Sequence, residues 1–234
     1  MTHELMKLFG PLFALAASAA FAGDPNTLTD AEQAAGWKLL FDGRTTAGWV
    51  AIGKGEFPAK GWRVSDGTLH HATKGGGDIV TSEHFQDFEL AWEWKIAPGA
   101  NGGLKYNLAD PVQNVGFEYQ MIDDAGYPKA RELAPAQLTG ALYALLETSS
   151  DKKLKPAGEW NASRILVKGN HVEHWLNGGK VLEFEMGGEA LKAAIAKSKF
   201  RDAPKFGEKT KSPILIQDHG DECWLRGLKI RVLQ

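Results

Sequence analysis

The chain has almost no cysteine and no excess of positive charge, and both shortages limit what it can be. Cys223 is the only cysteine among 234 residues, so no internal disulfide can form, and a lone thiol late in the chain is more typical of a small core residue than of a nucleophile. The formal net charge is −2, so no basic field attracts nucleic acid or an anionic membrane. The chain must fold on a hydrophobic core, for which its 43% of hydrophobic residues is an ordinary supply.

Several motifs with well-defined chemistry are also missing. The sequence has no H-E-x-x-H, no zinc-binding set of cysteines, no EF-hand loop and no G-x-S-x-G nucleophile elbow. His70-His71 and the pair His171 and His174 are one and three residues apart, so on strands they point to opposite faces and cannot share a metal. Gly75-Gly76-Gly77 follows no strand-to-helix signal, so it predicts a turn and not a phosphate loop.

The one long apolar run lies at the N-terminus. Leu8 to Phe21 follows Lys7 and contains the start of the small-x-small sequence Ala20-Phe21-Ala22, which is the pattern of a cleaved secretory signal and is too short to span a membrane. Residues 1–22 are therefore predicted to be a signal peptide. Residues 23–234 are predicted to form a single domain with no integral membrane segment, in the periplasm or outside the cell.

The rest of the chain has the sequence pattern of an all-β protein. Alternation with period two in Phe88–Trp94 and Phe117–Met121 predicts half-buried strands, and Asn177-Gly178 predicts a tight hairpin turn. Two short helices are expected, one opened by the capping box Thr29-x-x-Glu32 and one over residues 189–200. Short strands separated by glycine, asparagine and aspartate turns favour a jelly-roll sandwich of two antiparallel sheets.

Tryptophan is unusually abundant, with eight residues. Its flat face and polar edge suit both a sandwich core and stacking against a sugar ring. We expect core packing to account for most of the eight.

Alternation also decides which side chains share a face. Glu118 and Gln120 point away from the apolar residues of their strand, and Gln217 and His219 share a face of a strand predicted over residues 214–219. Solvated faces tend to carry Lys, Glu and Thr, whereas two glutamines, a glutamate and a histidine can hold sugar hydroxyls. We therefore interpret these four residues as a carbohydrate-binding face.

Two further pairs of polar residues can be interpreted either as ordinary surface positions or as part of a site. Lys105 and Asn107 oppose the apolar residues of a third strand, and taken alone they fit a solvated face. Asp123 and Asp124 end the strand that carries Glu118, where a turn signal and a functional rim are equally compatible with the sequence.

A set of short motifs, in order along the mature chain, resembles the bacterial 3-keto-disaccharide hydrolase family, whose fold is a concanavalin A-like or laminarinase-like jelly roll. Each motif is weak alone, but their order and spacing are specific. The motifs are Leu40-Phe41-Asp42-Gly43, Asp66-Gly67-Thr68-Leu69, Asp87-Phe88-Glu89-Leu90, Asn101-Gly102-Gly103-Leu104-Lys105-Tyr106, Glu118-Tyr119-Gln120-Met121-Ile122-Asp123-Asp124, Thr139-Gly140-Ala141-Leu142-Tyr143, Glu173-His174-Trp175-Leu176-Asn177-Gly178 and Gln217-Asp218-His219-Gly220.

The resemblance implies a substrate that is a glycoside or disaccharide oxidised to the ketone at C3. The ketone acidifies the proton on C2, so a base can remove it, the C1 group can leave, and water can add to the enone. On this route Glu118 or His219 would be the base, and Lys105 would stabilise the enolate oxygen. No cofactor is implied with certainty, although a divalent cation bridging the ketone and the C2 hydroxyl would do the work of Lys105 equally well.

The remaining site residues are assigned by the same resemblance. Gln120 and Gln217 would hold sugar hydroxyls, and Asp123 would act as an acid or as a ligand. The substrate-binding set also includes Asn107, Asp124 and His174.

Two other functions stay open on the sequence alone. One is a non-catalytic carbohydrate-binding module on the same fold, which the ionisable set Lys105, Glu118 and His219 disfavours. The other is a conventional glycoside hydrolase. The Glu-x-Asp-x-x-Glu strand of laminarinase-type enzymes has a middle carboxylate where this chain has Gln120, and this substitution argues against direct displacement at C1.

The leader prediction can be checked by mass. Expressed with its own leader, the protein should be recovered outside the membrane fraction with a mature N-terminus near Gly23, because signal cleavage follows the small-x-small sequence. A full-length mass in the membrane fraction would contradict the prediction.

Overall fold

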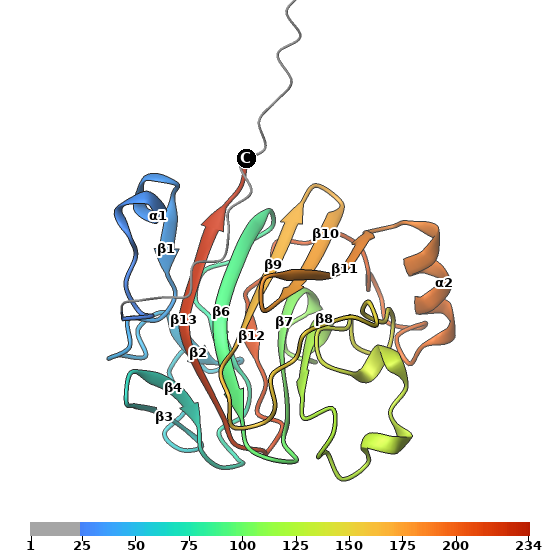
Figure 1. Ribbon diagram of the computed structural model, residues 1–234. Helices are drawn as coiled ribbons and strands as arrows, with labels where there is room; N and C mark the ends of the chain where they lie inside the picture. Colours follow the sequence, from blue (N-terminus) through green and yellow to red (C-terminus); the bar gives the residue numbers. More distant parts are fainter. Residues whose placement is uncertain (1–23) are drawn as a thin grey trace, which may run out of the picture.

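In a computed structural model, residues 24–234 form two antiparallel β-sheets packed against each other, with helices α1 and α2 on opposite sides (Figure 1). The predicted signal peptide, residues 1–22, lies outside the described residues. No helix among residues 24–234 is long and apolar enough to cross a membrane. The predicted all-β jelly-roll sandwich is confirmed.

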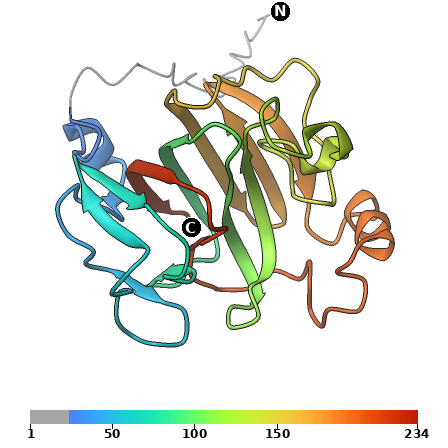
Figure 2. The same cartoon turned by 90° about the horizontal axis from the view of Figure 1, so that it is seen from below.

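The larger sheet has eight strands in the order β11-β10-β9-β6-β13-β4-β3, with β1 also paired to β13, and the smaller has the order β2-β5-β12-β7-β8. Seen from below, the blue-to-cyan strands and the orange strands lie on opposite sides, with the red C-terminal part of the chain between them (Figure 2). The strands are β1 Trp37–Leu39, β2 Trp49–Ala51, β3 Trp62–Ser65, β4 Thr68–His71, β5 Ile79–Thr81, β6 Phe88–Ile96, β7 Asn101–Asp110, β8 Val115–Ile122, β9 Asn161–Lys168, β10 His171–Leu176, β11 Gly179–Glu185, β12 Leu215–Ile216 and β13 Cys223–Val232.

The local predictions for helices and the hairpin are confirmed. Helix α1 (Asp30–Ala34) begins with the Thr29–Glu32 capping box, and α2 (Glu189–Lys197) lies where helical spacing was seen. Two 3₁₀ turns, Ala130–Glu132 and Pro135–Gln137, were not predicted. Asn177 and Gly178 both have positive φ, 47° and 85°, as a type I′ turn between β10 and β11 requires.

Aromatic side chains fill the space between the sheets. Trp92 meets Tyr119 edge to face with ring centroids 5.0 Å apart, and the Trp94 indole donates to Ser163. Half of the tryptophans, and not most of them, are core residues. Trp49, Trp62, Trp92 and Trp94 are buried, whereas Trp37, Trp160, Trp175 and Trp224 are only partly buried. Cys223 is buried as expected, and desolvation raises the pKa of its thiol to about 12.

His174 belongs to this core, so the prediction that it contacts substrate is wrong. Its strand turns Val172, His174 and Leu176 inward. One ring nitrogen lies 2.8 Å from the Gly140 carbonyl oxygen and the other 2.7 Å from the Tyr106 hydroxyl. The carbonyl can only accept, so Nδ1 carries the hydrogen and Nε2 accepts from Tyr106. Desolvation lowers the pKa of His174 to about 4.

Two inter-sheet connections lie together at one end of the sandwich. Residues 72–78 lead from β4 in the larger sheet to β5 in the smaller, and residues 217–222 lead from β12 back to β13. We call these two segments the crossovers. A strand was predicted to continue to His219, but pairing in β12 ends at Ile216 because Asp218 turns its side chain onto the first crossover, accepting hydrogen bonds from Gly75 and Gly77.

Burial of neutral His174 should make the protein lose stability in acid. The unfolded chain takes up this proton near pH 6.5 and the folded chain only near pH 4. The contribution of His174 is therefore complete above about pH 6.5, and about 3 kcal/mol of it is lost as the pH falls to about 4. Urea unfolding at several pH values should show this slope in the wild type and a flatter one in His174→Gln.

The exposed His84 supplies a control. His84→Gln should leave the pH dependence unchanged. A His174→Gln profile parallel to that of the wild type would contradict the assignment of a buried neutral imidazole.

Candidate active site on the smaller sheet

The outer side of the smaller sheet carries four polar side chains, those of Lys105, Glu118, Gln120 and Gln217, which together with Gly103 are here called the polar face. In the pairing of β7 with β8, Lys105 lies opposite Glu118, and Gly103 lies opposite Gln120. Gln217 follows β12 directly, and its N–H still bonds the Gly103 carbonyl at 3.1 Å. The residues between these positions point into the core. The four functional residues predicted at these positions are thus brought together by register.

A recessed ion pair lies at the centre of the polar face. Lys105 Nζ lies 3.2 Å from Glu118 Oε2 and 3.1 Å from the backbone oxygen of Asn114. The two residues are only 7% and 8% exposed, so this is not a solvated surface pair. Burial raises the pKa of Glu118, and the charge of Lys105 offsets part of that rise. A carboxylate with a raised pKa is a better proton acceptor than an ordinary surface glutamate.

Gly103 allows the glutamine and the glutamate to lie close to the sheet. A methyl group at Gly103 would come within 2.3 Å of Gln217 Oε1 and 2.7 Å of Glu118 Oε1. The Gln217 amide also points its Nε2 at Glu118 Oε2, at 3.4 Å. The two side chains therefore lie across Gly103, and only glycine leaves room for them.

The surroundings of the ion pair have more hydrogen-bond acceptors than donors. Among residues 24–234, seven buried side-chain nitrogen or oxygen atoms have no partner, and four of these are amide oxygens around the polar face. They are the side-chain oxygens of Asn101, Asn114, Gln120 and Gln217. Buried polar atoms are normally paired, so this set indicates a ligand that donates hydrogen bonds, as sugar hydroxyls do.

Sequence reasoning missed two residues near the polar face, Asp78 and Lys199. Asp78 accepts from the N–H of Asp218 at 2.8 Å and from the Asn114 side chain, and desolvation raises the pKa of Asp78. Lys199 lies 4.8 Å from the Tyr143 ring centroid, and its charge acts on Glu118. Asp78 could have been noticed, because it ends a glycine run. Nothing local marks Lys199, whose proximity depends on tertiary folding.

His219 lies at the rim and not on a strand. Its Nε2 is 3.2 Å from the Asn101 side-chain nitrogen, and its Nδ1 is 3.8 Å from Asp221 Oδ2. The imidazole is exposed, and its charge acts on Glu118. The structure therefore places His219 within electrostatic reach of the ion pair, at the edge of the polar face and not as a neighbour in the sheet.

Asn107 does not join the polar face, contrary to the prediction. It has a positive φ of 47°, and the β7–β8 register shifts between Tyr106 and Asp110. The side chain instead bonds the backbone of Glu208 and Thr210. An irregularity in the strand has reversed the alternation on which the prediction depended.

Asp123 and Asp124 are likewise occupied elsewhere. Asp123 accepts from three backbone N–H groups, of Gly99, Ala125 and Gly126, and these bonds lower its pKa although burial acts in the opposite direction. Asp124 accepts from the Thr139 N–H and pairs with Lys152 at 2.7 Å. An acid needs a carboxyl that holds its proton, so the expected role of Asp123 as an acid does not fit its surroundings.

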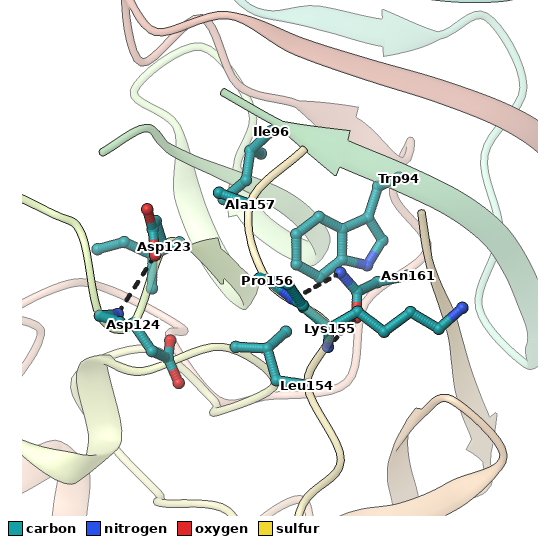
Figure 3. A pocket seen from close by; sticks show the side chains of 11 residues that line it. Trp94, Ile96, Asp123, Asp124, Leu154, Lys155, Pro156, Ala157 and Asn161 are labelled. Carbon is teal, nitrogen blue, oxygen red and sulfur yellow. Dashed lines mark hydrogen bonds between the residues drawn. The ribbon is translucent and has the colours of Figure 1, made fainter. Parts of the chain in front are cut away.

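Both aspartates line a cavity of about 250 Å³ at the end of the sandwich. Figure 3 shows them on one wall and the Trp94 indole on the other, with Leu154 and Pro156 between. Lys155 and Asn161 are bonded to each other across its edge. The walls are mostly apolar and the polar groups are already paired, so the cavity lacks the free acceptors that distinguish the polar face.

One group of residues among 24–234 has the spacing to hold a metal ion: His171, Glu173 and Glu183, on the larger sheet. Lys180 already contacts both glutamates, which supplies the positive charge that a cation would bring. At the polar face Lys105 already brings a positive charge to Oε2 of Glu118.

The chain is similar to a known protein family and to solved structures. A family model described as a 3-keto-alpha-glucoside-1,2-lyase-like domain matches residues 36–231. The chain is 29% identical to a curated 3-keto-disaccharide hydrolase of Bacteroides thetaiotaomicron, over 91% of this chain and 83% of the relative. A crystal structure of a proposed glycosyl hydrolase from Parabacteroides distasonis superposes with a TM-score of 0.82 at 36% identity, covering 89% of this chain and 99% of that one. A second from the same species has a TM-score of 0.65 at 28% identity and covers 84% and 99%.

Gly103→Ala should displace Gln217 and Glu118 because its methyl would overlap both side chains. We expect a loss of roughly 1–3 kcal/mol in the free energy of unfolding, as for overpacking of a closed site, and a shift of both side chains in a crystal structure. Gly102→Ala is the matched control, since its methyl would meet only the Met121 carbonyl at 3.9 Å. Equal behaviour of the two variants would contradict the close approach over Gly103.

Proposed function

Because this chain belongs to the 3-keto-alpha-glucoside-1,2-lyase-like family, we propose that it cleaves 3-keto-glycosides, including 3-keto-disaccharides, by elimination and hydration. The observation that carries the proposal is the recessed Lys105–Glu118 pair beside unpartnered amide oxygens. We also propose that the mature protein works in the periplasm or outside the cell, which rests on the leader pattern alone.

The reaction needs a base and an electrophile that act on neighbouring atoms of the sugar. The base removes the proton on C2, and the electrophile stabilises negative charge on the oxygen of C3. Lys105 and Glu118 are neighbours on paired strands, which matches this requirement. Glu118 takes the proton and Lys105 stabilises the enolate oxygen.

Three steps then complete the reaction: the C1 group leaves, it is protonated, and water adds to the enone. The enolate re-forms the C3 ketone as the C1–O bond breaks, which leaves an enone and the released alkoxide. A proton reaches the alkoxide, and His219 at the rim is the candidate donor in place of Asp123. Water then adds at C1, and C2 takes back a proton. Gln120 and Gln217 accept from sugar hydroxyls through the oxygens that have no partner.

Two features speak against direct displacement at C1. Ordinary glycosidases place two carboxyl groups around the scissile bond. On β8 the position beyond Glu118 on the same face is Gln120, and the next carboxylate, Asp123, is held by backbone N–H groups outside the polar face. A single buried carboxylate beside a lysine suits proton abstraction better.

The decisive experiment compares a 3-keto disaccharide with its unoxidised parent and uses substrate deuterated at C2. Only the keto form should release sugar, and deuterium at C2 should either exchange with water or slow the reaction, because the C2–H bond must break. Equal cleavage of both sugars with full retention of label would place the protein with conventional glycosidases. Binding of both without cleavage would indicate a carbohydrate-binding module. A parallel assay with EDTA separates the Lys105 route from one that needs a cation.

Glu118→Gln should reduce turnover by on the order of a hundredfold or more through loss of the base. Because Lys105 loses a buried partner, the free energy of unfolding should also fall, by roughly 1–3 kcal/mol, so folding must be checked by circular dichroism.

In the wild type kcat/KM should rise with pH as Glu118 deprotonates, at a pH above that of an ordinary glutamate. The exposed Glu147→Gln is the control. Wild-type turnover in folded Glu118→Gln would shift the role of base to His219.

A further inference from the structure

His71 is a buried histidine that the proposed mechanism does not use. It is the last residue of β4 and has no solvent exposure. Its Nδ1 lies 2.7 Å from the backbone oxygen of Asp221, and its Nε2 lies 2.8 Å from Asp218 Oδ1 in an ion-pair contact too bent to be a hydrogen bond. Both nitrogens face oxygens that accept. One ring therefore holds the second crossover at two points.

Asp218 gathers contacts from both crossovers. Its side chain is 5% exposed and accepts from the N–H groups of Gly75 at 2.9 Å, Gly77 at 2.8 Å and Gly220 at 3.1 Å. Burial raises the pKa of Asp218, but the N–H groups of Gly75 and Gly77 and the neighbouring His71 lower it overall. A buried carboxylate that accepts several backbone bonds is held in one orientation.

The same contacts lead directly to the polar face. Gln217 is the residue before Asp218, and the Asp218 N–H bonds Asp78, whose other oxygen bonds Asn114. The Asn114 backbone oxygen in turn accepts from Lys105. On the other side, Asp221 Oδ2 accepts from the N–H of Asn101, which contacts His219.

We propose that His71 and Asp218 form a positioning pair, the crossover clamp, which sets Gln217, Asp78 and His219 relative to the Lys105–Glu118 pair. Gln217 keeps one backbone bond to Gly103, but the chain from Asp218 to His219 has left the sheet, so strand pairing does not position that part. His71, which lies in the larger sheet, fixes the position of this segment through its contacts with Asp218 and Asp221. As a role in turnover the proposal rests on the proposed function, whereas the ordering of the crossovers can be measured without substrate.

Three variants of the full mature chain test the clamp. Asp218→Asn keeps the shape but replaces an accepting oxygen with a donating amide. In His71→Gln the amide nitrogen can occupy the position of Nε2 and keep the contact with Asp218, whereas in His71→Asn it can occupy the position of Nδ1 and keep only the bond to Asp221. His70→Asn is the matched control, since the neighbouring ring points to the other side of the sheet, where it contacts Arg63 and the last residue of the second crossover, Glu222, instead of Asp218 and Asp221.

The first readout is amide hydrogen exchange by NMR. In Asp218→Asn and His71→Asn the amides of Gly75, Gly77 and Asn101 should exchange roughly tenfold or more faster, with smaller changes at the core amides of Leu90 and Ile165. The second readout is the split between kcat and KM on a 3-keto disaccharide. We expect kcat to fall by on the order of a hundredfold in these two variants, with His71→Gln retaining more activity than His71→Asn.

The outcomes separate the clamp from the proposed function. Wild-type exchange at Gly75, Gly77 and Asn101 in folded clamp variants would overturn the proposal, and so would kcat values equal to that of His70→Asn. Faster exchange at all amides, including those of the core, would mean that His71 only stabilises the whole fold, and this result would also overturn the proposal. If the wild type turns over no 3-keto sugar, the proposed function fails, and the exchange data alone decide whether the clamp orders the crossovers.

Discussion

The register between β7 and β8 is the constraint on which the site depends. It places Lys105 opposite Glu118, and a slip of one residue in either strand would turn that strand's member of the pair into the core. The core prevents such a slip, because on the inner side Tyr106 packs edge to face on Phe117, 5.7 Å between ring centroids, and its hydroxyl bonds His174. The aromatic core is therefore what sets the geometry of the charged pair on the other side of the sheet.

The buried pair has an electrostatic cost that its surroundings only partly offset. Desolvating a carboxylate and an ammonium group costs several kcal/mol each, and the attraction between the two charges need not offset that cost. Lys105 gains a backbone acceptor from Asn114, but Glu118 keeps a raised pKa, and four amide oxygens nearby stay unpaired. A site optimised for stability alone would pair these atoms. Leaving them unpaired costs stability and keeps acceptors available for a ligand.

How much the sequence could predict follows from how regular each segment is. Alternation correctly brought Lys105, Glu118, Gln120 and Gln217 to one face, because those positions lie in or beside regular pairing. It failed for Asn107, where a positive φ interrupts β7, and it could not show that Asp123 is bound by the backbone of a distant turn. His174 was misread because its hydrogen-bond partners, 34 and 68 residues away, make a polar core position tolerable. Each miss depends on contacts between distant segments, which local patterns do not encode.

The outer faces of the two sheets show why charge and aromatic content alone are poor guides to a site. On the larger sheet the partly buried tryptophans are covered by cations, with Arg164 4.1 Å from the Trp175 centroid and Arg226 4.0 Å from that of Trp160. Neighbouring glutamates pair with the same arginines. On that face the charged groups pair with one another, and the Nε of Arg231 is the one buried polar atom there without a partner among the described residues. The smaller sheet has fewer aromatic groups outside, yet its acceptors are unpaired and its carboxylate is desolvated. Unmet hydrogen-bonding capacity, rather than the abundance of tryptophan, therefore separates the face proposed to bind sugar from the face whose charged groups pair with one another.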